Sequence, residues 1–410
     1  MALQLKRNRQ KFLFILLITA IYTVLVVKSN FLQGIKINDE PHFWETSLSF
    51  SDSLIPSIDA IRNYRDLNTP LPFMMFGAVE YFFHLDVFGG RLLNLILSIV
   101  MALIIGWPSK DKKRTSILCL IGLFICPYFL ICSGRLYTDI IACFWVLLGF
   151  VAYVRDRHLL SSIAFILGIA SRQFMLAFPA AIATYELILA LNRIKNTRRF
   201  DLTSQWRWIA PSIAACTIFG WIYLFKGLAP ATGIEELAPT VQKTTWAIQP
   251  NRAVYFLSFT TIYIVIPELI LFRPWAKIRS LWSHKRRIAY IAAGLLIYCI
   301  VFPPEINSSG MFTPFLDLLH YDFLKSVLFY VLALIACIRF CEPNLMQICI
   351  LFHCIIMMKA HYWSKYVLPL SVVFWYLKSL GLEDEFGFRQ VVRDWSVGRE
   401  RRELASSSKR

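Results

Sequence analysis

Asn38-Asp39-Glu40-Pro41-His42-Phe43 is the stretch around which the chain is organised. It follows a first apolar segment, residues 12–27, and precedes a long polar loop. Asn-Asp before Pro is common in solvent-exposed turns, and this interpretation stays open for the stretch alone. Two adjacent carboxylates and an imidazole at the edge of a membrane segment also suit a general base that is held at the membrane surface.

The composition indicates a polytopic membrane protein. Hydrophobic residues make up 57% and charged residues 17% of the 410 positions, whereas about a quarter of a soluble domain is charged. The first apolar segment has a basic flank, but Val27-Lys28-Ser29-Asn30 offers no cleavage site of small residues, so we expect a retained first helix. The ten cysteines fall mostly in apolar runs without metal-type spacing, which is typical of small buried hydrophobes.

The net charge of +17 comes from short basic clusters between apolar segments. This distribution is typical of the positive-inside pattern and of contacts with anionic lipid headgroups, and it argues against a nucleic-acid partner. The clusters are residues 110–114, 155–157, 193–199, 273–287 and the end of the chain after residue 381.

Hydropathy predicts an all-α protein with about twelve transmembrane helices. Residues 1–380 form a single multispan catalytic domain in this prediction, with outer loops at 29–90, 226–252 and 303–323, and residues 381–410 form a basic cytoplasmic tail. The apolar part of the first outer loop, residues 70–88, is expected to form a juxtamembrane helix. No internal repeat is visible, so the repeat signature of many secondary transporters is missing. The predicted spans are residues 12–27, 91–107, 115–132, 137–154, 159–171, 173–191, 206–225, 253–272, 288–302, 324–341, 345–360 and 367–380.

Polar side chains from four separate segments are expected to meet on the outer face. Charged groups at or inside a membrane boundary are costly and tend to mark pathways or sites. A carboxylate can deprotonate an acceptor hydroxyl, a second carboxylate can orient that hydroxyl or hold a divalent metal, and Arg or Lys can neutralise a departing phosphate. The four groups are Asp39, Glu40, His42 and Glu45; Arg135, Tyr137 and Asp139; Arg172 and Gln173; and His361, Lys365 and Tyr366.

Four of these residues also have a structural interpretation. Asp139 opens a predicted helix, where a negative charge suits the helix dipole. Lys365 and Arg172 fit snorkelling to lipid headgroups. His361 fits a hydrogen-bonded interfacial histidine. These alternatives stay open at the level of sequence.

Several of the motifs carry a resemblance to a known family. The acidic pair after the first span, the outer Tyr137-Thr138-Asp139 and the late Ser364-Lys365-Tyr366-Val367-Leu368-Pro369 resemble the GT-C superfamily of multispan glycosyltransferases, which use polyprenyl-phosphate-linked sugars. Residues 136–178 are similar to the dolichyl-phosphate-glucose α-1,2-glucosyltransferases. The Asp-Glu-Pro-His-Phe run also resembles the undecaprenyl-phosphate-aminoarabinose transferases. Residues 226–323 match nothing in these families, so the acceptor is open.

The resemblance implies an inverting transfer of a sugar from dolichyl or undecaprenyl phosphate to a lipid-linked glycan, lipid or protein acceptor. Asp39 would be the base, or Glu40 if the register is shifted by one, and Asp139 the second acid. The donor phosphate would be bound by residues among Arg135, Tyr137, Arg172, Gln173, His361, Lys365 and Tyr366. Some members use a divalent metal such as Mg or Mn and others use none; His42 and Glu45 permit such a site.

The implied location is the endoplasmic reticulum membrane or a bacterial plasma membrane, with the active site on the lumenal or periplasmic side. The partners would be the lipid-phosphate-sugar donor, a membrane acceptor and membrane lipids. Two other functions stay open. One is a transporter or flippase of a lipid-linked saccharide, and the other is a multispan scaffold without catalysis.

Overall fold

A computed structural model describes residues 2–28, 31, 36–107, 113–197, 202–244, 247–273, 285–304, 306 and 311–382. Every regular element in these ranges is a helix, which confirms the all-α prediction. The elements are α1 (Ala2–Lys28), α2 (Glu40–Leu48), α3 (Ile58–Asn63), α4 (Leu71–Phe83), α5 (Val87–Gly106), α6 (Lys113–Ile125), α7 (Pro127–Ser133), α8 (Thr138–Val154), α9 (His158–Ser171), η1 (Gln173–Leu176), α10 (Ala177–Thr197), α11 (Leu202–Phe225), α12 (Ala231–Leu237), α13 (Thr240–Lys243), α14 (Asn251–Thr260), η2 (Thr261–Val265), α15 (Ile266–Phe272), α17 (Lys285–Val301), α18 (Thr313–Asp317), α19 (Asp322–Arg339), α20 (Leu345–Met357), η3 (Ser364–Val367) and α21 (Leu368–Leu380).

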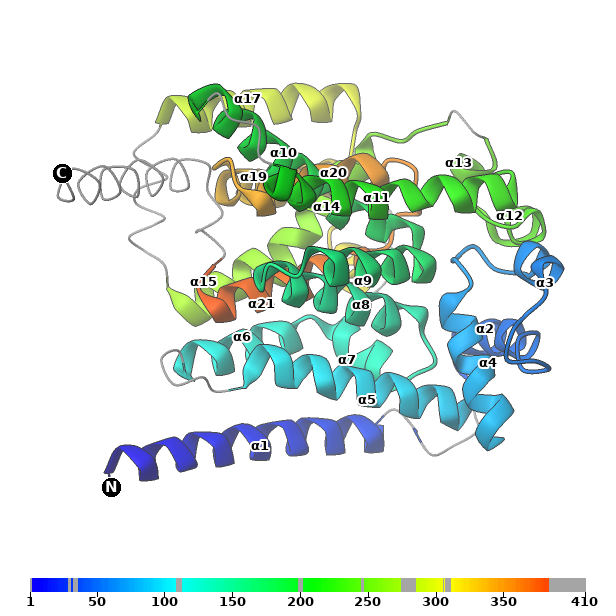
Figure 1. The fold of residues 1–410 in the computed structure, drawn as a ribbon. Coiled ribbons are helices and arrows are strands. Elements are labelled where there is room, and N and C mark those ends of the chain that lie inside the picture. Colours follow the sequence, from blue (N-terminus) through cyan, green and yellow to red (C-terminus); the bar gives the residue numbers. More distant parts are fainter. Residues whose placement is uncertain are drawn as a thin grey trace, which may run out of the picture.

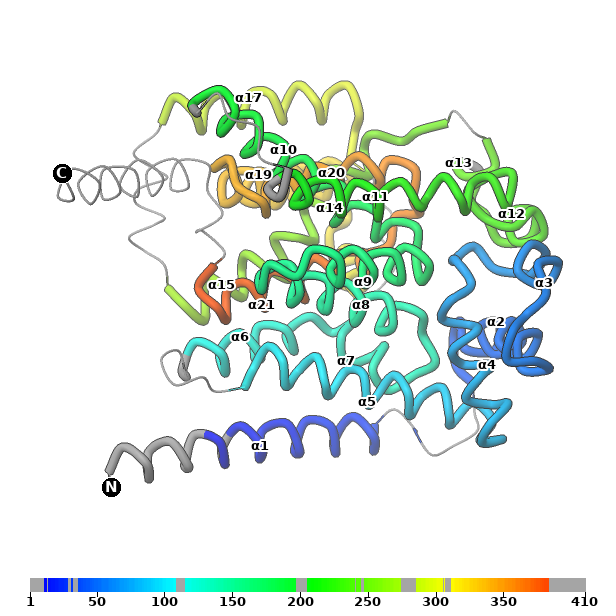
Figure 2. Tube along the Cα trace, viewed as in Figure 1, coloured from blue at the N-terminus to red at the C-terminus, as the bar shows by residue number. Residues whose placement is uncertain are grey.

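The long helices lie side by side, and the short helices α2, α3, α4, α12 and α13 gather at one end of the bundle (Figure 1). Helix α8 packs on α9, α10 packs on α11 and α20, and α14 packs on α19. Segments distant in sequence therefore meet at the end that carries α2. The trace in Figure 2 shows this for α12, which lies beside α3, and the Thr232 hydroxyl donates a 2.9 Å hydrogen bond to the carbonyl of Tyr64 there.

Within the described ranges, four helices are long and apolar enough to cross a membrane: Val87–Gly106, Gln173–Asn196, Gln205–Phe225 and Asn251–Phe272. A fifth crossing is possible if Thr115–Ile125 and Pro127–Ser133 count as one span. Helices occupy all the predicted segments, but several, such as Thr138–Val154 and His158–Ser171, are short. The membrane-type character of the bundle thus agrees with the sequence, while the number of about twelve spans stays a prediction.

The predicted span 115–132 is wrong in one respect, because it contains a sharp break. Its two helices, α6 and α7, meet at an angle of 78°. Pro127 is the first residue of α7, and Cys126 before it has an extended backbone. Proline removes a backbone donor and disfavours helical geometry in the preceding residue, which explains the break.

Helix α21 lies in the core, and its residues are buried from Leu368 to Ser379. Trp375 is fully buried against α6. A Cβ atom at Gly122 would lie 2.4 Å from the Trp375 ring, so only glycine allows this approach. The close packing of α6 on α21 therefore depends on the glycine at position 122.

An ion cluster holds three helices together at the end of the bundle away from α2 (Figure 1). Glu268 on α15 accepts hydrogen bonds of 2.7 and 2.8 Å from Arg339 on α19 and one of 2.8 Å from Lys378 on α21. All three side chains are buried. Buried charges persist only when they are paired, so this cluster fixes the relative positions of α15, α19 and α21. Most of the predicted tail lies outside the described residues, which end at 382.

Candidate functional site

A buried ion pair joins the start of α8 to the end of α9. Asp139 is the second residue of α8 and has no exposed surface, and Arg172, which follows α9, is 5% exposed. The Arg172 Nη1 atom donates a hydrogen bond to Asp139 Oδ1. Asp139 does lie at a helix start, where the dipole favours a carboxylate. The burial of Arg172 excludes the snorkelling interpretation for this residue.

Lys365 connects this ion pair to Asp39. Its Nζ atom lies 3.8 Å from Asp139 Oδ2 and 3.7 Å from Asp39 Oδ2. The same atom lies 3.6 Å from the centroid of the Trp363 ring, and the side chain is 3% exposed, so Lys365 does not snorkel either. Both carboxylate distances exceed the range of a direct hydrogen bond, about 2.7–3.2 Å. Lys365 therefore neutralises both acids while a substrate oxygen can still approach it.

Asp39 is the accessible acid of this group. Its side chain is 34% exposed, whereas those of Asp139 and Glu40 are fully buried. Asp39 directly precedes α2, and Asn38 before it has a φ of 58°, a left-handed conformation that asparagine tolerates. This turn places the Asp39 carboxylate at the surface of the cluster, where a substrate can reach it.

Glu40 faces away from this opening and is held by a different set of partners. Its carboxylate accepts hydrogen bonds of 2.9 and 2.7 Å from Arg91 and one of 2.8 Å from the backbone N–H of Leu136. The backbone N–H of Ile37 donates another, at 3.1 Å. Burial would raise the pKa of Glu40, but these hydrogen bonds outweigh it and lower the pKa from its ordinary value. The geometry makes Glu40 a positioning residue and does not fit the expectation that it acts as the base.

Arg135 and Tyr137 differ in how they contribute to the cluster. The Tyr137 ring lies 5.1 Å from Lys365 Nζ and is 5% exposed, so it forms part of the wall. The Arg135 carbonyl accepts a 2.7 Å hydrogen bond from Asn94. Within the described ranges the Arg135 guanidinium makes no ion pair with Asp39 or the other cluster acids. The structure therefore does not make this guanidinium part of the ion cluster of Asp39, Asp139, Arg172 and Lys365.

A large cavity, mostly apolar, begins at Arg172. It has a volume of about 690 Å³. Its polar lining comes mainly from Arg172, Gln173, Lys359 and His361, and Tyr366 completes the wall beside Arg172. The apolar lining comes from Leu67, Phe174, Leu176, Ile218, Phe219, Ile222, Leu228, Ile234, Leu237 and Ile356, among others. An apolar chamber with cations at one part of its wall suits a lipid chain with an anionic head.

Gln173 and His361 have different roles in this wall. The Gln173 side-chain amide donates hydrogen bonds of 2.6 and 3.1 Å to the carbonyls of Leu67 and Leu228, so it connects two loops and offers less to a ligand than expected. The Nδ1 atom of His361 is buried without a hydrogen-bond partner. Burial, followed by the charges of Arg252 and Lys365, lowers the pKa of His361. The sequence analysis allowed a hydrogen-bonded histidine at the membrane interface. The structure instead shows a buried imidazole whose Nδ1 atom has no hydrogen-bond partner.

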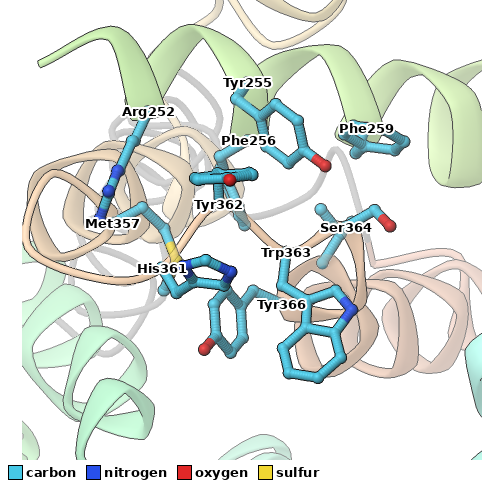
Figure 3. Close-up of a pocket in the computed structure, with 11 residues that line it drawn as sticks. Arg252, Tyr255, Phe256, Phe259, Met357, His361, Tyr362, Trp363, Ser364 and Tyr366 are labelled. Atoms are coloured by element: carbon cyan, nitrogen blue, oxygen red, sulfur yellow. The ribbon is translucent and has the colours of Figure 1, made fainter. Parts of the chain in front are cut away.

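A small pocket adjoins the cavity at His361, Trp363 and Tyr366 (Figure 3). Aromatic rings line most of it, and Arg252 lies at its edge (Figure 3). Arg252 donates a hydrogen bond to the carbonyl of Ala360 and lies 5.7 Å from the Tyr362 ring. This contact fixes the loop that carries His361 and Lys365.

His42, one of the two residues of the predicted metal site, contacts a buried carboxylate. His42 Nε2 lies 2.9 Å from Asp66 Oδ2, so this ring nitrogen is committed to that carboxylate. Asp39, the other acid nearby, faces the ammonium group of Lys365. In the ranges that the structure describes, no three His, Cys, Asp or Glu side chains come together in a way that could hold a metal ion. The divalent metal that the resemblance allows at His42 and Glu45 stays a prediction.

Sequence reasoning missed three residues that the structure places around the site. Arg91 holds Glu40, Asp66 holds His42, and Lys359 lines the cavity while donating hydrogen bonds to carbonyls after α12. Arg91 was detectable as a charge at the start of an apolar span. Asp66 sits in an ordinary polar loop, and only its distant contacts distinguish it. No known family model, curated protein or solved structure matches the chain.

Proposed function

We propose that the chain is a membrane glycosyltransferase that moves a sugar from a polyprenyl-phosphate carrier to a lipid-linked glycan, lipid or protein acceptor. The observation that carries this proposal is the junction at Arg172, which belongs both to the buried ion cluster and to the wall of the apolar cavity. An accessible carboxylate, Asp39, lies on the other side of the same cluster. A donor with an apolar chain, a phosphate and a sugar requires these three environments in this order.

In the proposed reaction the Asp39 carboxylate accepts the proton of the acceptor hydroxyl. The hydroxyl oxygen attacks the anomeric carbon from the face opposite the phosphate, and a new C–O bond forms. The bond between the anomeric carbon and the phosphate oxygen breaks, and its electron pair leaves with the lipid phosphate. Configuration at the anomeric carbon is inverted. Arg172, Lys365 and His361 supply positive charge or hydrogen bonds to the departing phosphate.

The buried acids support these groups without touching the substrate. Asp139 holds Arg172 and Lys365 in place, because its carboxylate lies beside both cations. Glu40 fixes the backbone just before Asp39 and just before Tyr137, because it accepts hydrogen bonds from the N–H groups of Ile37 and Leu136. A preorganised site of this kind needs little rearrangement when charge develops on the phosphate.

We propose the same membrane arrangement that hydropathy predicts, with about twelve crossing helices and with α2, α3, α4, α12 and α13 on the outer or lumenal side. Single cysteines introduced at exposed Ser53 and Arg157 test it with a membrane-impermeant maleimide, compared with the unsubstituted protein. Labelling of Ser53→Cys from outside and of Arg157→Cys only after permeabilisation is expected. Labelling of both from one side would contradict this arrangement.

The test of function is sugar release or transfer by the purified full chain from radiolabelled polyprenyl-phosphate-glucose, -mannose and -arabinose-type donors, with membrane lipid extract as acceptor. Wild type is compared with Asp39→Asn and with a matched control, Asp52→Asn, an exposed aspartate of the same outer segment. We expect one donor to turn over with wild type and the control and not with Asp39→Asn. Parallel reactions with EDTA decide whether a divalent metal takes part. Donors that bind without turnover, but cross vesicle membranes in the presence of the protein, would favour a flippase instead.

A further inference from the structure

His42 and Asp66 form a pair beside the cluster. The Nε2 atom of His42 lies 2.9 Å from Asp66 Oδ2, and the backbone N–H of Asn68 donates a 2.7 Å hydrogen bond to Asp66 Oδ1. The Asp66 side chain is 3% exposed, whereas that of His42 is 31% exposed. A buried carboxylate that is held on both oxygens fixes the orientation of a partly accessible imidazole and leaves its Nδ1 atom for another partner.

The segment that carries Asp66 is rigidly attached to the rest of the site. The Thr69 hydroxyl donates a 2.7 Å hydrogen bond to a carbonyl near the end of α9, and Gln173 donates one of 2.6 Å to the carbonyl of Leu67. A Cβ atom at Gly233 would lie 2.3 Å from the carbonyl oxygen of Asp66, so α12 packs directly on this backbone. Three separate elements therefore hold the carboxylate that orients His42.

His42 lies one helical turn after Asp39, beyond the 4.0 Å range of a direct ion pair. Asp39 is the N-cap of α2 and His42 is the third helical residue, and positions three apart share one face of a helix. When Asp39 takes a proton, Lys365 loses one of its two negative neighbours and shares the other, Asp139, with Arg172. Two buried cations facing one buried carboxylate are unfavourable. A neighbouring base with its own carboxylate would relieve this state.

We infer that His42, held by Asp66, is a proton relay that receives at Nδ1 the proton that Asp39 takes from the acceptor hydroxyl. The inference rests on the proposed transferase function. The O–H bond of the acceptor breaks and a carboxyl O–H forms on Asp39. That bond then breaks as Asp39 passes the proton to a solvent water molecule, which gives up a proton as the N–H bond forms on His42; the two side chains are 34% and 31% exposed, so water reaches both. The imidazolium releases the proton to solvent through its exposed side, and Asp39 is an anion again beside Lys365. His42 is thus a relay and Asp66 a positioning residue.

The electrostatic surroundings of His42 fit this role. The hydrogen bond to Asp66 raises the pKa of His42, burial opposes this, and the charges of Asp66, Glu45 and Asp39 raise it further. The result is a pKa above the ordinary value, about 6.5 for histidine. His42 must start neutral to accept a proton, so transfer should slow as the pH falls through the raised pKa. A site that relied on carboxylates alone would lose its rate only near about pH 4.

The experiment is the pH dependence of the initial transfer rate between pH 4 and 9 with the purified full chain and the donor found above. As the pH falls below the pKa of His42, in the neutral range, the wild-type rate should decrease about tenfold per pH unit. This decreasing part of the pH–rate profile is called the acid limb. Asp66→Asn should move this limb to lower pH by roughly one unit, because the carboxylate that raises the pKa is gone. His42→Gln should lower the rate at pH 8 by about 10–100-fold and remove the limb.

His320→Gln, a substitution of an exposed histidine outside the site, is the control and should retain the wild-type profile. Asp66→Glu, which retains the charge, should keep the limb if Asp66→Asn does not fold. A wild-type limb near pH 4, or a limb that both His42→Gln and Asp66→Asn leave in place, would overturn the relay. Absence of transfer by wild type at every pH would overturn the proposed function itself.

Discussion

Replacement of Asp139 tests whether the buried cluster is a stabilising ion network. Asp139 has no exposed surface, contacts Arg172 directly and lies 3.8 Å from Lys365. Asp139→Asn removes one negative charge between two buried cations: Lys365 keeps Asp39 as its carboxylate neighbour, and Arg172 loses its direct carboxylate partner. Removal of one partner from a buried ion pair costs about 3–5 kcal/mol. We expect the free energy of unfolding to fall by about this amount.

The double variant Asp139→Asn, Arg172→Gln separates charge from shape. It replaces the ion pair by two neutral amides of similar size, which can still form a hydrogen bond. The double variant should therefore lose less stability than the two single variants added together. The difference, which is the coupling energy of the pair, should be about 2–3 kcal/mol. Lys365 then faces Asp39 without a competing cation.

The assay is thermal unfolding of the four proteins in lipid nanodiscs, with the same lipid and protein concentration. For a chain of this length 1 kcal/mol corresponds to roughly 2 °C, so each single variant should lose roughly 6–10 °C in Tm. The double variant should recover roughly 4–6 °C of the combined loss, which corresponds to the coupling of about 2–3 kcal/mol. Single variants within about 2 °C of wild type, or strictly additive losses, would refute the view that Asp139 and Arg172 are a coupled buried pair.

Three further predictions concern other parts of the molecule. Glu268→Gln, at the opposite end of the bundle, should also lower the free energy of unfolding by about 3–5 kcal/mol with transfer per folded molecule retained; a stable but inactive variant would contradict this. Gly233→Val should lower both Tm and transfer, because a Cβ atom there would meet the backbone of Asp66 at 2.3 Å, whereas Gly294→Ala, with no atom within 4 Å, should behave like wild type. The lowered pKa of His361 leaves it neutral near pH 7, and a bound phosphate would raise that pKa again, so donor affinity should be higher at pH 6 than at pH 8. A pH dependence of affinity that persists in His361→Asn would exclude this linkage.

Hydropathy was sufficient to predict the long apolar helices, because each apolar run must satisfy its backbone internally. It did not predict the short helices α2, α3, α12, α13 and α18, which lie in the predicted outer loops. A helix is present within the predicted juxtamembrane segment 70–88, namely α4 (Leu71–Phe83), and its location at the membrane surface stays a prediction. Pro127 lies inside the predicted span 115–132. Hydropathy alone predicts one continuous span there, because the residues on both sides of the proline are apolar. The number of crossings could not be fixed, since several apolar helices have fewer residues than a full span needs.

The site was predicted in outline from residue type and order along the chain. Asp39, Asp139, Arg172 and Lys365 converge as expected, although they come from four different segments. The sequence could not separate Asp39 from Glu40, because adjacent positions at a helix start point in different directions and only the location of Arg91 decides which one is buried. Local patterns likewise gave no indication of which loop residue contacts His42.

The charge balance of the cluster bears on how a phosphate could enter it. Arg172 and Lys365 are already balanced by Asp139 and Asp39, so an anion placed between them would be repelled by both carboxylates. His361 lines the same cavity as Arg172 and has no carboxylate within ion-pair distance in the part of the chain that the structure describes. A donor phosphate is therefore best placed between Arg172 and His361, with the sugar directed toward Asp39. Protonation of Asp39 during transfer then reduces the repulsion at the moment when the phosphate gains negative charge.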